Sequence, residues 1–103
     1  MIRYKTIKLD IPANGSNKET ILTVTDGKKV QLKGFGRTSE FSCLSFIEIE
    51  ADRVVECPCE FAVNQGNFIP LDIVVEGPKA IQAGGEDTGG IDHTIQLTLA
   101  YEE

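Results

Sequence analysis

The sequence predicts an all-β fold: an antiparallel β-sandwich of the jelly-roll kind, with about seven or eight short strands and no substantial helix. Two observations favour this fold class. Apolar and polar residues alternate with a period of two along most of the chain, and no window shows the 3.6-residue period of an amphipathic helix. Turn-forming residues also recur at short intervals between the alternating segments. The chain has 103 residues, and we expect residues 1–103 to form a single domain.

The first third of the chain is expected to form three strands joined by two tight turns. The strands are TIKLDI, TILTVT and VQLKGFG, and the turns are centred on Asn14-Gly15 and on DGKK. Asn-Gly is typical of a hairpin because both residues tolerate positive φ. The residues expected on the apolar faces are Ile7, Leu9 and Ile11 in the first strand, and Leu22 and Val24 in the second. This order predicts a β-meander.

The central segment, residues 40–63, is expected to be a hairpin that turns at Ala51-Asp52. On its first strand one face would hold Phe41, Cys43, Ser45, Ile47, Ile49 and Ala51, while Glu48 and Glu50 face water. On the returning strand the apolar face would hold Val55, Cys57, Cys59, Phe61 and Val63. Pro58 has no backbone donor, which predicts that this strand is a sheet edge or is broken there.

The last third of the chain is expected to add two more strands. NQGN at 64–67 is expected to be a turn, and FIPLDIVVEG then places Leu71, Ile73 and Val75 on one face. The glycine-rich AGGEDTGG, residues 83–90, is expected to be a mobile loop, dispensable for folding over 84–90. The final strand would carry on one face Ile91, His93, Ile95, Leu97, Leu99 and Tyr101.

The cysteines are expected to be structural. Cys57 and Cys59 share a face with apolar neighbours, and free cysteine is among the most buried residue types. A zinc site from these two residues with Cys43 and His93 would have suitable ligand types, but the spacing differs from that of the usual zinc knuckles. The odd number of cysteines does not suggest a disulfide framework. We therefore predict that Cys57 and Cys59 are buried, reduced and free of metal.

No catalytic, cofactor-binding or metal-ligating set is expected, and we predict that the protein is not an enzyme. His93 and a cysteine could form a nucleophile–base pair, but His93 is in register with apolar residues and is expected to be a packed or rim residue. Glu86, Asp87 and Asp92 offer oxygen ligands for calcium, although their spacing is irregular for such a loop. The hypothesis of a plain loop is preferred.

The charges restrict the partners. The net charge of −6 and the pI of about 4.7 argue against nucleic acid and anionic membranes. Up to Arg37 the chain has eight basic and three acidic residues, and after it only Arg53 and Lys79 are basic. Basic and acidic strands could be neighbours in one fold, or they could form a subunit interface. We expect a homo-oligomer, most simply a head-to-tail ring. The charged N-terminus does not resemble a signal peptide, which predicts a cytoplasmic or virion-associated protein.

The stretch IPANGSNKETILTVTDGKKVQLKGFG, followed by FIEIEADRVVE, resembles small β-sandwich or jelly-roll proteins of phage virions and prophage regions. The resemblance covers residues 11–56 and consists of a pattern of turns and strands. It implies a non-enzymatic, self-associating structural role and assigns no functional residue. The alternative is a small ligand-binding module, for carbohydrate or another small molecule. Aromatic residues for sugar stacking are scarce, because the chain has no tryptophan and its only tyrosines are Tyr4 and Tyr101.

Overall fold

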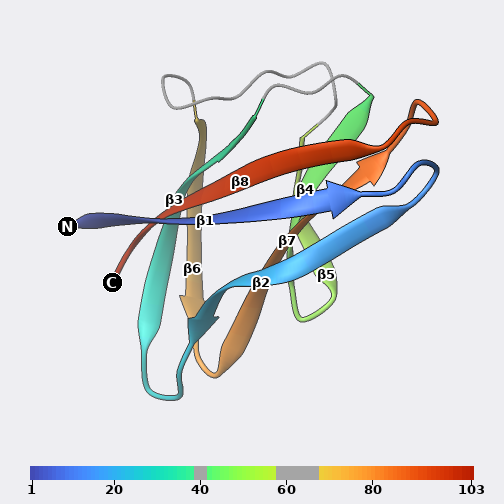
Figure 1. Cartoon of the computed structure of the whole chain (residues 1–103). Coiled ribbons are helices and arrows are strands. Elements are labelled where there is room, and N and C mark those ends of the chain that lie inside the picture. Colours follow the sequence, from blue (N-terminus) through green and yellow to red (C-terminus); the bar gives the residue numbers. More distant parts are fainter. Residues whose placement is uncertain (39–41, 58–67) are drawn as a thin grey trace.

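The computed structural model describes residues 1–38, 42–57 and 68–103, which form eight antiparallel strands in two four-stranded sheets (Figure 1). The strands are β1 (Ile2–Ile11), β2 (Ser16–Val24), β3 (Lys29–Arg37), β4 (Cys43–Ile49), β5 (Asp52–Cys57), β6 (Ile69–Glu76), β7 (Lys79–Asp87) and β8 (His93–Glu102). The predicted all-β sandwich is confirmed. None of the described residues belongs to a helix that could cross a membrane.

Consecutive strands alternate between the sheets over the first third of the chain. Sheet A has the order β1-β8-β3-β6 and sheet B the order β2-β7-β4-β5, so β1, β2 and β3 are not neighbours in one sheet. The predicted β-meander is therefore wrong. Both predicted turns exist, at Asn14 (φ 59°) and at Gly27 (φ 79°), but each carries the chain from one sheet to the other. Turn residues fix a change of chain direction and do not decide whether the two strands they join pair with each other.

The core lies between the sheets and follows the period-two pattern closely. Leu97 and Leu99 of sheet A and Ile47 and Ile81 of sheet B are fully buried. The predicted faces of β6 and β8 are confirmed, except that Ile91 precedes β8 and is 52% exposed. The predicted face of β2 is wrong in part. A register shift between Thr20 and Leu22 buries Ile21 and leaves Leu22 half-buried.

The segment predicted as a mobile glycine loop is largely an interior strand. β7 extends to Asp87 and pairs with both β2 and β4, so only the residues after it form the turn. Ala83 is fully buried, and a Cβ at Gly84 would lie 2.4 Å from the backbone oxygen of Asn17. Glycine is needed here because the neighbouring strand approaches too closely for any side chain. The loop prediction is therefore wrong for residues 83–87.

Candidate functional site: the outer face of sheet A

The cysteines that the structure describes belong to the core. Cys43 and Cys57 are fully buried and form no disulfide, and β5 is an edge strand as Pro58 suggested. Burial raises the pKa of the Cys57 thiol, and this effect exceeds the opposing one of Arg37. Arg37 is itself 3% exposed and donates from Nη1 to the Cys43 carbonyl oxygen, 2.6 Å away. Cys59 lies outside the described residues, so its predicted burial stays a prediction.

His93 is packed, as expected, and its partner is a carboxylate. The residue is 3% exposed, and Nε2 lies 2.8 Å from Oδ1 of Asp87. The same carboxylate accepts backbone N–H bonds from Asn14 at 2.7 Å, Gly90 at 2.8 Å and Gly89 at 3.0 Å. The N–H of Asn14 is the largest of several hydrogen bonds that hold the pKa of Asp87 well below its usual range.

Two of the three acids considered as calcium ligands, Asp87 and Asp92, contact the turn before β2, and the third, Glu86, pairs with Arg53. Asp87 binds the turn that precedes β2, and Asp92 accepts the N–H of Ala13 in that turn at 2.8 Å. Among the residues that the structure describes, no group of three or more His, Cys, Asp or Glu side chains could hold a metal ion. Asp87 and Asp92 thus connect the turn before β2 to the segment between β7 and β8, and we call this set of contacts the clamp.

On the outer face of sheet B, Arg53 covers the ring of Phe46, and we call Arg53 together with its carboxylate partners the lid. Phe46 alternates with the core-facing Ser45 and Ile47, so its ring lies on the outer face, yet it is only 2% exposed. The Arg53 guanidinium covers the ring at 4.0 Å from its centroid, and the ring edge contacts the site where Gly84 lacks a side chain.

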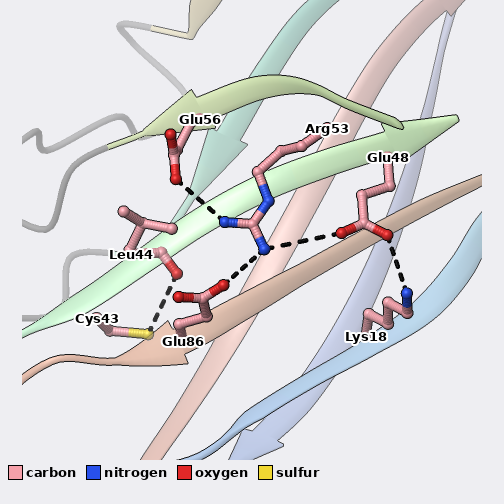
Figure 2. Close-up of polar contacts among 7 residues, drawn as sticks. All are labelled: Lys18, Cys43, Leu44, Glu48, Arg53, Glu56 and Glu86. Atoms are coloured by element: carbon pink, nitrogen blue, oxygen red, sulfur yellow. Dashed lines mark hydrogen bonds and ion pairs between the residues drawn. The ribbon is translucent and has the colours of Figure 1, made fainter. Parts of the chain in front are cut away.

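Carboxylates hold this lid in place (Figure 2). Arg53 contacts Glu86 at 2.6 Å, Glu56 at 3.1 Å and Glu48 at 3.7 Å. The hydrogen bond to Glu86 is the main reason that the pKa of Arg53 is raised. Glu48 also contacts Lys18 at 2.9 Å and is only 8% exposed. The prediction that Glu48 faces water is wrong, because Lys18 of β2 and Arg53 of β5 cover it.

On the outer face of sheet A, by contrast, no such cover is formed by the residues that the structure describes, and this face contains a groove of about 750 Å³. Gly34, Gly36 and Ala100 form its floor, and the Phe68 ring lies directly against Gly36, where a Cβ would be 2.4 Å from the ring. Tyr4 meets Phe68 edge to face, with ring centroids 6.2 Å apart. The groove is lined by residues of all four strands of sheet A.

Apolar groups remain exposed along this groove. Tyr4 is 63% exposed and Ile2 is 47% exposed, in contrast with Phe46 under its lid. Polar groups lie beside them: Thr6 and Thr98 share a hydrogen bond of 2.9 Å, and Gln96 completes that side of the lining. An open apolar surface with a few polar groups is the usual form of a binding site.

Sequence reasoning missed this site, although one signal was present. Gly34 and Gly36 in VQLKGFG are two residues apart in a strand, so both lie on the same face of the sheet. Glycines on one face of a strand indicate the close approach of another group. Here that group is the Phe68 ring, whose position no local pattern predicts.

Ion pairs within the fold balance only part of the basic charge of the first third of the chain. Three lysines of the first half pair with acids elsewhere in the chain: Lys18 with Glu48, Lys29 with Glu76 and Lys33 with Glu102. Arg3, Lys5 and Lys8 on β1 are exposed and make no ion pair with any described residue. One edge of sheet A therefore keeps an unbalanced basic charge beside the groove.

Among the described residues, fold and site together define a two-sheet β protein with a covered Phe46 ring on the outer face of sheet B and a groove on the outer face of sheet A. No family model matches the sequence, and no similar curated protein was found. One similar solved structure is the nucleoplasmin-like N-terminal domain of Drosophila FKBP39. It is 14% identical, with 95% of this chain and 87% of that chain covered and a TM-score of 0.42. A likeness of this degree carries no argument about function.

Proposed function

We propose that the protein is a non-enzymatic assembly module that binds other protein chains through the outer face of sheet A. The observation that carries the proposal is the contrast between the two outer faces. In sheet B, Arg53 covers the Phe46 ring and is held there by three carboxylates, whereas in sheet A the rings of Tyr4 and Phe68 border a groove that no described residue covers. Exposed apolar surface of this kind marks interaction sites in soluble proteins. The alternation of β1, β2 and β3 between the sheets supports a jelly-roll arrangement.

A second copy of the chain is the simplest partner. The groove supplies apolar surface, and the basic β1 on a chain of net charge −6 supplies a charge asymmetry that favours a head-to-tail contact. Apolar area would hold such an oligomer together, and the charges would set its orientation and its rate of assembly. A virion-type role, which the sequence resemblance implies, is one form of this proposal. Adjacent capsid or tail genes would support it.

Sedimentation velocity at about 50 and 500 mM salt tests self-association, because these conditions change the Debye length from about 14 to about 4 Å. We expect an oligomer in both buffers, with slower assembly and a modest shift of the equilibrium at high salt. A strict monomer at high protein concentration in both buffers would rule out the homo-oligomer.

A second candidate function is the binding of a small ligand, such as an oligosaccharide, in the same groove. Tyr4 and Phe68 offer aromatic surface, and Thr6, Thr98 and Gln96 offer hydrogen-bonding groups beside it. Isothermal titration calorimetry with a panel of oligosaccharides distinguishes the two. A monomer that binds one of them, and loses binding on Tyr4→Ala, would favour this candidate over assembly.

A further inference from the structure

The N-terminal half of β1 is an open sheet edge. β1 pairs with β8 on one side, and no described strand pairs with its other side. Toward the N-terminus β1 diverges from β2, with which it shares a turn (Figure 1). All five residues from Ile2 to Thr6 are exposed, whereas the core-facing residues Leu9 and Ile11 are buried. Over about one strand's length, the backbone groups that point away from β8 are available to another strand.

The side chains of this edge differ between its two faces. Ile2, Tyr4 and Thr6 lie on the face of the groove, opposite Glu102, Ala100 and Thr98 of β8. Arg3 and Lys5 lie on the other face and make no ion pair with a described residue. A strand added here would therefore meet apolar groups on one face and two cations, two residues apart, on the other.

Strands of a second copy match this edge poorly. If two β1 edges paired antiparallel about Tyr4, Arg3 of each copy would face Lys5 of the other, and like charges directly opposite are unfavourable. The other edge strands with two exposed acids are β5 and β6. Their acids are four residues apart, at Asp52 and Glu56 and at Asp72 and Glu76, so neither strand can place a carboxylate beside both cations.

We propose that the edge formed by Ile2–Thr6 binds an extended peptide segment of another protein, with acidic residues at alternate positions and apolar residues between them. The segment would add to sheet A as a fifth strand. Its backbone would pair with β1, its carboxylates would lie beside Arg3 and Lys5, and its apolar side chains would lie beside Ile2 and Tyr4. This proposal goes beyond the assembly function, because it concerns a different partner.

The experiment measures fluorescence anisotropy of a labelled peptide, GSVEVEVGS, titrated with the full chain. We expect binding that weakens about tenfold on Lys5→Glu, since the reversal removes one attractive charge pair and also places like charges opposite each other. The matched control is Lys28→Glu, which reverses another exposed lysine in the turn before β3 and should leave the affinity unchanged within about twofold. The peptide GSVKVKVGS should bind the variant Arg3→Glu/Lys5→Glu more tightly than it binds the wild type. Both substituted side chains are exposed, so folding should be retained.

Two further measurements separate strand addition from other contacts. A peptide N-methylated at all five residues of its VEVEV core cannot donate backbone hydrogen bonds to β1, whichever residues face that strand, and should not bind. The unmodified acidic peptide should slow amide exchange within residues 2–6. No binding at about 1 mM peptide, equal effects of Lys5→Glu and Lys28→Glu, or full binding of the methylated peptide would overturn the proposal. Self-association of the peptide-free protein that Lys5→Glu abolishes would assign the edge to a second copy and also overturn it. Sedimentation of the peptide-free wild type tests the assembly function separately.

Discussion

Gly84→Ala tests whether the glycine-rich segment is an interior strand. The added Cβ would lie 2.4 Å from the Asn17 carbonyl oxygen, 2.7 Å from Cβ of Lys18 and 2.7 Å from Cζ of Phe46. Ordinary contact begins near 3.4 Å, so β2 must move by about 1 Å, and the aromatic ring must shift as well. Overpacking of this kind costs about 1–3 kcal/mol. For a domain of this size each kcal/mol lowers the melting temperature by about 4–8 °C.

Urea unfolding followed by circular dichroism measures this change in free energy. Gly34→Ala is the matched control, because a Cβ added at Gly34 would lie 3.4 Å from its nearest neighbouring atom, which is ordinary contact, and the backbone there does not have a positive φ. The free energy of unfolding of the control should remain within about 0.5 kcal/mol of the wild-type value. If the free energy of unfolding of Gly84→Ala also lies within that margin of the wild-type value, β2 and β7 do not approach each other as closely as described. The segment would then be better explained as a mobile loop.

Three other predictions concern the clamp, the core and the lid. The pKa of Asp87 is lowered in the folded state, so its stabilising contribution is present above the unfolded pKa of about 4 and is lost as the pH falls below it. Asp87→Asn should therefore flatten the decline of the urea midpoint between about pH 5 and pH 3, and an unchanged slope would contradict this. Cys57→Ser should cost about 1–3 kcal/mol, and thiol labelling of Cys57 should require unfolding; rapid labelling of the native protein would refute its burial. Arg53→Ala should uncover Phe46 and lower the free energy of unfolding by about 1 kcal/mol or more. Arg53→Lys should have a stability between those of Arg53→Ala and the wild type. If Arg53→Ala is as stable as the wild type, the cover over Phe46 is dispensable.

The period-two pattern of apolar residues predicts those structural features that depend on one strand alone. The buried faces of β6 and β8, the burial of Cys43 and Cys57 and the edge position of β5 are all confirmed. Each of these depends on alternation or on the missing donor of Pro58, which are local properties. The turn before β5 lies one residue earlier than predicted, since Glu50 and Ala51 have the positive φ angles.

Pairing between distant strands could not be predicted in the same way. Which sheet β2 joins depends on its packing against β7, and the four glycines of 84–90 give that segment the composition of a loop although half of them lie in a strand. The burial of Glu48 depends on Lys18 and Arg53, which reach it from two other strands. The groove likewise depends on Phe68 meeting Gly36, a contact between β3 and the residue before β6.

Sedimentation equilibrium of three proteins decides whether the outer face of sheet A is the assembly surface. The wild type is compared with Tyr4→Glu, which places a charge in the groove, and with Val54→Glu, which places the same charge on an exposed apolar residue of β5 outside it. We expect the wild type and Val54→Glu to form the same oligomer and Tyr4→Glu to be a monomer. An oligomer that Tyr4→Glu leaves intact, or that Val54→Glu dissociates, would contradict this expectation.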